Sequence, residues 1–175
     1  MSNINYGIFI ILYFICFWIA PPIAAETVNF IGAVTNITCD VYVEVDGVPG
    51  NVVDLGRVGT SNPSADGRYF RLKPEPYHPG CLTLTAQDKV VMTWAGDFSS
   101  PTGFLSAQSG GALDATVYIM QDQRPYSGYI MRGSLSAYVD GETFLREGSR
   151  YFSAIIPGRL TGTFQAAAAF VISYP

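Results

Sequence analysis

Few residues in this chain are of the types that carry out chemistry. The only histidine, His78, lies between Tyr77 and Pro79 in a proline-rich stretch. A hydrolytic triad needs a base, which is usually a histidine, and no G-x-S-x-G nucleophile motif accompanies this one. The sequence around His78 is typical of a turn exposed to solvent.

Paired carboxylates are the other arrangement that could support catalysis, as in glycoside hydrolysis. The acidic residues here lie mostly in turns or beside glycine, where solvation explains them without catalysis. They include Asp46, Asp54, Asp66, Asp88, Asp97, Asp114, Asp140, Glu142 and Glu147. No phosphate-binding loop, zinc spacing or calcium-binding loop is present. The sequence therefore indicates binding or assembly rather than an enzyme, and it predicts no metal and no cofactor.

The N-terminus carries an export signature. Residues 1–25 contain no charged side chain, and the apolar run at residues 8–20 is followed by PPIAA. This arrangement is typical of a secretory signal peptide, with cleavage expected after Ala25. The alternative is an uncleaved anchor, but the run is short for a membrane span, which needs about 20 apolar residues. We expect a signal peptide at 1–25 and one exported domain at 26–175.

Two cysteines, Cys39 and Cys81, remain in that domain. In an oxidising compartment two cysteines favour a disulfide, and two free buried thiols are the alternative. The net charge is −4, and the charges are scattered. Because the chain has no basic stripe, nucleic acid is not expected as a partner.

Nearly every segment of the domain has the pattern of a strand or a turn. Short apolar alternations punctuated by Gly and Pro, with no amphipathic helix, predict an all-β antiparallel sandwich. The length fits an immunoglobulin-like sandwich, and a jelly roll or barrel is the alternative. The expected strands are 37–45, 52–58, 68–72, 81–85, 89–95, 104–108, 112–120, 128–132, 134–139, 143–145, 150–156 and 162–175.

The last segment, GTFQAAAAFVISYP, is the most informative. Strict alternation places Phe164, Ala166, Ala168, Phe170, Ile172 and Tyr174 on one face of an extended strand. An apolar strand with an open edge invites pairing with another chain. An ordinary strand paired on both sides is one alternative. A helix favoured by the alanine run is another, and Gly162, Val171 and Ile172 argue against it.

Several motifs in order resemble the chaperone–usher fimbrial subunits, the pilins of Gram-negative bacteria. Residues 28–39, VNFIGAVTNITC, resemble the first strand of the family, which carries a glycine before the first half-cystine. VDLGRV at 53–58, VVMTWAG at 90–96 and RYFSAI at 150–155 resemble later strands. Gly162, the alternating apolar residues and the penultimate Tyr174 match the C-terminal recognition pattern of the family.

The resemblance implies an immunoglobulin-like fold that lacks its seventh strand. The missing strand leaves a groove beside the last strand, which a periplasmic chaperone fills before an outer-membrane usher exchanges it for the N-terminal extension of a neighbouring subunit. This is β-augmentation. Carried over to this chain, the groove residues are Gly162, Phe164, Ala166, Ala168, Phe170, Ile172 and Tyr174, with the carboxylate of Pro175 as anchor. The resemblance also implies the Cys39–Cys81 disulfide and export through the periplasm to a surface fimbrium.

One feature departs from the family pattern. With cleavage after Ala25, only ETVNFI precedes Gly32, so the donor segment is short or absent. A subunit that cannot donate a strand can only be the first in the fibre. We therefore keep a position at the fibre tip as a hypothesis. In that position the subunit would contribute to adhesion, with a host receptor as its partner. A minor or major subunit with a short donor is the alternative. A self-contained secreted Ig-like lectin or receptor domain is the alternative from another functional class.

Overall fold

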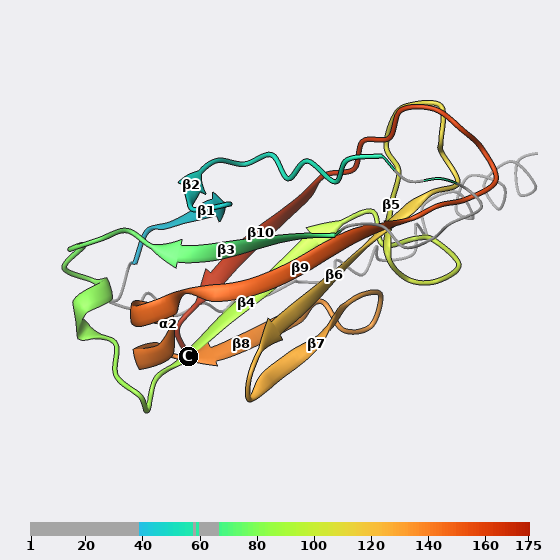
Figure 1. Cartoon of the computed structure of the whole chain (residues 1–175). Helices are drawn as coiled ribbons and strands as arrows, with labels where there is room; N and C mark the ends of the chain where they lie inside the picture. The colour runs from blue at the N-terminus through green and yellow to red at the C-terminus, as the bar shows by residue number, and fades with distance from the viewer. Residues whose placement is uncertain (1–38, 58, 60–66) are drawn as a thin grey trace, which may run out of the picture. The chain divides into compact units, whose positions relative to one another are not determined.

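Alternating side chains organise the chain into two antiparallel sheets (Figure 1). The computed structural model describes residues 39–57, 59 and 67–175, all within one compact unit, Thr35–Pro175. The predicted signal peptide, the donor segment and the part of the first strand before Cys39 lie outside the described residues.

The elements follow one another in this order along the chain. They are β1 (Val41–Val45), β2 (Val48–Pro49), β3 (Arg68–Pro74), the 3-10 helix η1 (Cys81–Thr83), β4 (Lys89–Gly96), β5 (Leu105–Ser106), β6 (Thr116–Gln123), β7 (Tyr126–Ile130), β8 (Ser136–Asp140), α2 (Gly141–Glu147), β9 (Ser149–Ile156) and β10 (Ala168–Ser173).

The larger sheet has the strand order β2-β1-β3-β9-β6-β5, with β7 also paired to β6. The smaller sheet has the order β10-β4-β8, and every strand pairing is antiparallel. The all-β antiparallel sandwich predicted from the sequence is confirmed. Its immunoglobulin-like topology and its missing final strand stay predictions.

Aromatic side chains join the two sheets across the core. Trp94 of β4 lies 5.2 Å from Tyr151 of β9 and 6.1 Å from Phe70 of β3, measured between ring centroids. Both contacts are edge-to-face, a favourable arrangement for aromatic rings. Phe70 and Tyr151 stack on each other at 5.3 Å. Since Tyr151 is fully buried, its burial raises the pKa of the phenol to about 12, and the ring stays neutral.

A disulfide ties the start of β1 to η1. Cys39 and Cys81 are bonded, with their Cα atoms 4.6 Å apart and a sequence separation of 42. Cys81 is 2% exposed, and the two half-cystines belong to the hydrophobic core. The pairing expected from the sequence is therefore present.

The prediction of a strand at 143–145 is wrong, because these residues lie in helix α2. The side chain of Asp140 accepts a hydrogen bond from the Thr143 N–H at 2.8 Å, which caps the helix N-terminus. Glu142 in the first turn and Arg146 in the last complement the helix dipole. Phe144 is fully buried, so the helix closes one end of the core.

Two further expected strands are also wrong. Residues 52–57 form no strand, because Asp54 accepts a hydrogen bond from the Gly56 N–H at 2.9 Å in a local turn. Val53 and Leu55 nevertheless pack against the core. Residues 81–85 begin as η1, and Leu82 is 66% exposed. The apolar residues of both segments resemble a strand in sequence because burial and strand pairing leave similar patterns.

Candidate functional site

The C-terminal segment is extended and pairs along one edge with two different partners. Residues Ala168–Ser173 form β10 and pair with β4 in a register that places Phe170 opposite Trp94. Before β10, the Ala112 N–H donates to the Thr163 carbonyl at 3.1 Å, and Gln165 forms an antiparallel bridge with Ser109. The side-chain amide of Gln108 also donates to the Ala167 carbonyl, at 3.1 Å.

The alternation of main-chain groups shows which edge of β10 is used. In an antiparallel ladder, the N–H and C=O of one residue point to the same neighbouring strand. The Trp94 N–H donates to the Leu135 carbonyl, so even-numbered residues of β4 bond toward β8. Odd-numbered residues of β4 therefore bond to β10, where their partners are Ala169, Val171 and Ser173.

The even-numbered residues of β10 accordingly direct their main-chain groups to the opposite edge. These residues are Ala168, Phe170 and Ile172. Within the described ranges, no strand is paired with that edge. It presents a row of alternating donors and acceptors of the kind that an added strand bonds to.

The same residues face the core with their side chains. Six half-buried side chains of the segment pack against the core cluster, namely Phe164, Ala166, Ala168, Phe170, Ile172 and Tyr174. Phe170 lies 5.6 Å from the Trp94 ring. On the other face Val171 is 68% exposed. The residues whose main-chain groups lie at the open edge are therefore the same residues whose side chains face the core.

Gly162 marks the beginning of this segment for a steric reason. Its φ is 141°, a conformation that side chains disfavour, and a Cβ there would lie 2.8 Å from the Gly111 Cα. Only glycine lets the two backbones approach this closely, so the terminal segment can reach residues 109–112. The glycine of the C-terminal motif thus has a structural cause.

Tyr174 holds the far end of the segment. Its hydroxyl donates a hydrogen bond to the Cys39 carbonyl at 3.0 Å, beside the disulfide. Burial, together with the negative charge of Asp40, raises the pKa of Tyr174 to about 12, so the hydroxyl keeps its proton at neutral pH. Pro175 follows as an exposed last residue.

Comparison with known proteins bears on the family. No protein-family model matches the chain. The F107 fimbrial protein of Escherichia coli is 28% identical over 148 residues, which are 84% of this chain and 85% of that protein. The K99 fimbrial protein of Escherichia coli is 34% identical over 84 residues, 48% of this chain and 44% of that protein. The chain is a relative of fimbrial proteins.

The resemblance to the fimbrial subunit family is thereby confirmed. In this fimbrial relative, the residues that the sequence predicts for the groove lie in one segment. All eight, from Gly162 to Pro175, belong to the extended terminal segment. Sequence reasoning missed the segment that pairs with it at residues 108–112. The only signal there was the glycine pair at 110 and 111, since pairing with such a distant segment leaves no local periodicity.

The remaining chemical candidates in this fimbrial relative have structural partners. The His78 ring lies 3.8 Å from the Asp40 carboxylate, and its Nδ1 accepts a hydrogen bond from the Gly80 N–H at 3.3 Å. Among the described residues, no three His, Cys, Asp or Glu side chains gather into a possible metal site. Nor does that part of the chain contain a helix long and apolar enough to cross a membrane.

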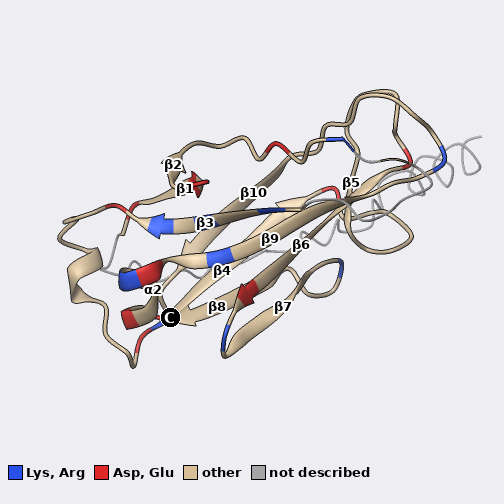
Figure 2. Cartoon of the chain, in the orientation of Figure 1, with Lys and Arg blue, Asp and Glu red and all other residues tan. Residues whose placement is uncertain are grey.

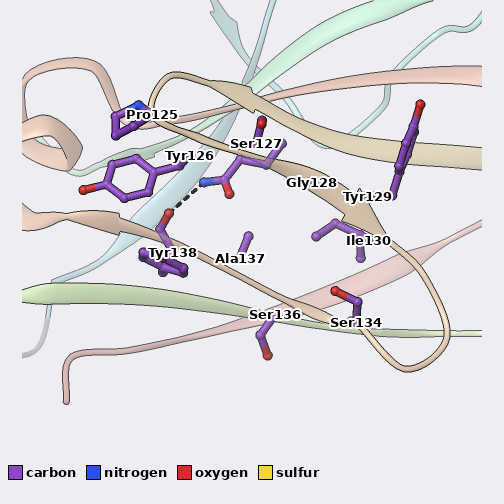
Figure 3. Close-up of a pocket in the computed structure, with 11 residues that line it drawn as sticks. Pro125, Tyr126, Ser127, Gly128, Tyr129, Ile130, Ser134, Ser136, Ala137 and Tyr138 are labelled. Atoms are coloured by element: carbon purple, nitrogen blue, oxygen red, sulfur yellow. Dashed lines mark hydrogen bonds between the residues drawn. The ribbon is translucent and has the colours of Figure 1, made fainter.

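A cavity of about 190 Å³ separates β7 from β8 (Figure 3). The Gln121 side-chain amide donates to the Tyr138 carbonyl across it at 3.0 Å. The rings of Tyr126 and Tyr138 lie 5.1 Å apart at one end of it. The lining contains no carboxylate, histidine or cysteine, so it offers no acid–base pair or metal ligand set.

Replacing Gly162 with alanine tests the origin of the glycine motif. We expect Gly162→Ala to lower the free energy of unfolding by about 1–3 kcal/mol, because the new Cβ meets the Gly111 backbone at a disfavoured φ. Chemical denaturation of the purified protein measures this. Gly50→Ala is the matched control, since a Cβ there meets nothing within 4 Å. Equal stability of the two variants would contradict the steric explanation.

Proposed function

We propose that this protein is a structural subunit of a fimbrium and that it assembles by donor-strand exchange at the outer edge of β10. One observation carries the proposal. The residues of β10 whose main-chain groups point away from β4 are the same residues whose apolar side chains pack against the core. An added strand would hydrogen-bond to these main-chain groups and at the same time cover these apolar side chains.

The relatives support the part of the proposal that concerns a fimbrial subunit, since both are named fimbrial proteins. A fimbrial subunit works at the cell surface and contacts other fimbrial subunits. The part that concerns donor-strand exchange specifies which strands pair with the outer edge of β10. A periplasmic chaperone would supply the first strand, an outer-membrane usher would direct its replacement, and a neighbouring subunit would supply the second. A tip position and a host receptor stay predictions.

The small side chains of Ala166 and Ala168 give the proposal a specific form. They lie next to each other on this face, between the large rings of Phe164 and Phe170. A strand added at this edge would therefore place its larger side chains over the alanines, because apolar side chains pack best where volumes complement each other.

Hydrogen exchange of β10 tests the proposal within a single strand. The exported chain is produced in a periplasm with a fimbrial chaperone, and amide exchange is compared between the chaperone complex and the chain produced alone. We expect slow exchange of Ala168, Phe170 and Ile172 only in the complex. Ala169 and Val171 already bond to β4 and serve as internal controls, with similar protection in both samples.

The yield of the same two preparations separates the proposal from its alternative. We expect most of the soluble protein to be a one-to-one complex with the chaperone, and the chain produced alone to be recovered in a much lower yield. A stable monomer produced without a chaperone, with Ala168, Phe170 and Ile172 already protected, would contradict donor-strand exchange. That result would favour a self-contained Ig-like binding domain.

A further inference from the structure

Two arginines lie directly opposite each other on neighbouring strands of the larger sheet. The register of β3 and β9 pairs Arg71 with Arg150. Directly opposed residues have Cβ atoms about 5 Å apart, and like charges at this separation repel and destabilise a sheet. The structure thus contains a local conflict, and such conflicts are expected at functional sites.

Both arginines project from the outer face of this sheet. Along β3, Phe70 and Leu72 are buried in the core, so Arg71 points the other way. Along β9, Ser149 and Tyr151 are fully buried, which places Arg150 on the same outer face. This face lies away from β10, and a ligand bound there would leave the proposed strand-exchange edge unaffected.

A third arginine adds to the positive charge. Arg124, in the turn between β6 and β7, lines a hollow of about 330 Å³ together with Arg71, Arg150, Asp122, Gln123 and Glu147. In Figure 2 basic stretches are visible on β3, on β9 and in this turn, and an acidic one ends β6. The volume is within the usual range of small-ligand sites.

The acidic residues of the hollow neutralise only part of this charge. Asp122 lies 3.3 Å from the Arg150 guanidinium. Glu147 is engaged by Arg146, at 2.9 Å. Among the described residues, Arg71 and Arg124 have no acidic partner within 4.0 Å. Two guanidinium groups are therefore available to an incoming anion, and their planar forks match a carboxylate or a sulfate.

An exposed aromatic surface adjoins the arginines. The Arg150 guanidinium lies 4.1 Å from the centroid of the Tyr69 ring, and Tyr69 contacts Phe152 with ring centroids 4.9 Å apart. Tyr69 is 43% exposed although it lies on a sheet face that is normally polar. The C–H groups of a sugar ring pack well against such rings, whereas an acidic peptide would need only the charges.

We propose that the hollow formed by Arg71, Arg124 and Arg150 binds an acidic carbohydrate, with its carboxylate or sulfate on the guanidinium groups and its ring against Tyr69. The repulsion between Arg71 and Arg150 is then relieved by the ligand. Without ligand, removing one charge stabilises the sheet, so Arg71→Gln raises the melting temperature by about 1–3 °C.

Calorimetric titration of the purified exported protein, as its chaperone complex where it is isolated in that form, tests the proposal. The probes are lactose 3′-sulfate against lactose and trigalacturonate against galactotriose, with the chaperone alone as blank. We expect one or both acidic sugars to bind and the neutral sugars not to bind. The acid that binds more tightly identifies the preferred group.

Variants locate the binding. The double variant Arg71→Gln/Arg124→Gln should lower the affinity for the acidic sugar by about tenfold or more, since each charged hydrogen bond contributes strongly to binding. Arg159→Gln and Arg57→Gln together change the net charge equally at exposed positions outside the hollow, and should leave affinity within about twofold. Three results would each overturn the proposal: no binding of either acidic sugar, equal loss in both double variants, or binding of hexaglutamate as tight as that of the better sugar.

Discussion

The substitution Ile172→Asp is expected to abolish recovery of the protein with a fimbrial chaperone. Ile172 packs against the core from the face of β10 that also directs its main chain to the outer edge, opposite the fully buried Met92. A carboxylate there would be taken out of water without a partner. The cost of about 3 kcal/mol or more corresponds to a loss of at least a hundredfold in the population of the folded, strand-accepting state.

Val171→Asp provides the matched control for this prediction. It introduces the same charge at the adjacent residue of the same strand, but Val171 is 68% exposed on the other face. The only expected cost in stability comes from the lower β propensity of aspartate and is about 1 kcal/mol or less. Periplasmic yield of the chaperone complex is the measurement. Normal yield of Ile172→Asp, or an equal loss in Val171→Asp, would show that the inward face of β10 does not receive a partner.

Removal of the disulfide is expected to have the second large effect. The 42-residue separation of Cys39 and Cys81 makes the bond worth about 4 kcal/mol in the chain-entropy model. The effect should extend to the C-terminus, because Tyr174 bonds to the Cys39 carbonyl. We therefore expect Cys39→Ala/Cys81→Ala to lower the free energy of unfolding by about 3–4 kcal/mol and to reduce periplasmic yield.

Urea denaturation with and without a reductant measures this loss. Reduced wild type should match the double variant, whereas the double variant should not respond to the reductant. Because the alanines leave no free thiol, disulfide exchange cannot account for a difference. Unchanged urea midpoints in the double variant would mean that the hydrophobic core alone fixes this end of the sandwich.

Strands with clear alternation were predictable from local sequence. Residues 89–95 alternate between buried and outer positions, as do residues 150–153, and the structure places β4 and β9 there. Val117 and Ile119 of β6, in the expected strand 112–120, are both buried. In such strands each side chain reports its own environment, because one face is buried and the other is not.

Other segments were decided by contacts that leave no periodic trace. The helix at Gly141–Glu147 is too short for a helical repeat to be recognised, and its cap depends on the position of Asp140 at the end of β8. Val53 and Leu55 reach the core from a segment without strand structure. A buried apolar residue has the same sequence appearance in a strand, a helix or a loop.

For the terminal segment, the sequence alone determined the two faces and the residues on each, from Phe164 to Tyr174. It also pointed to Gly162, although not to its reason. Only the tertiary structure decided that β10 bonds to β4 through Ala169, Val171 and Ser173, and so which main-chain groups point to the outer edge. Alternation along a strand is a local property, whereas the choice of neighbour depends on residues far away in the chain. The pairing of Arg71 with Arg150 is also visible only once β3 and β9 are side by side.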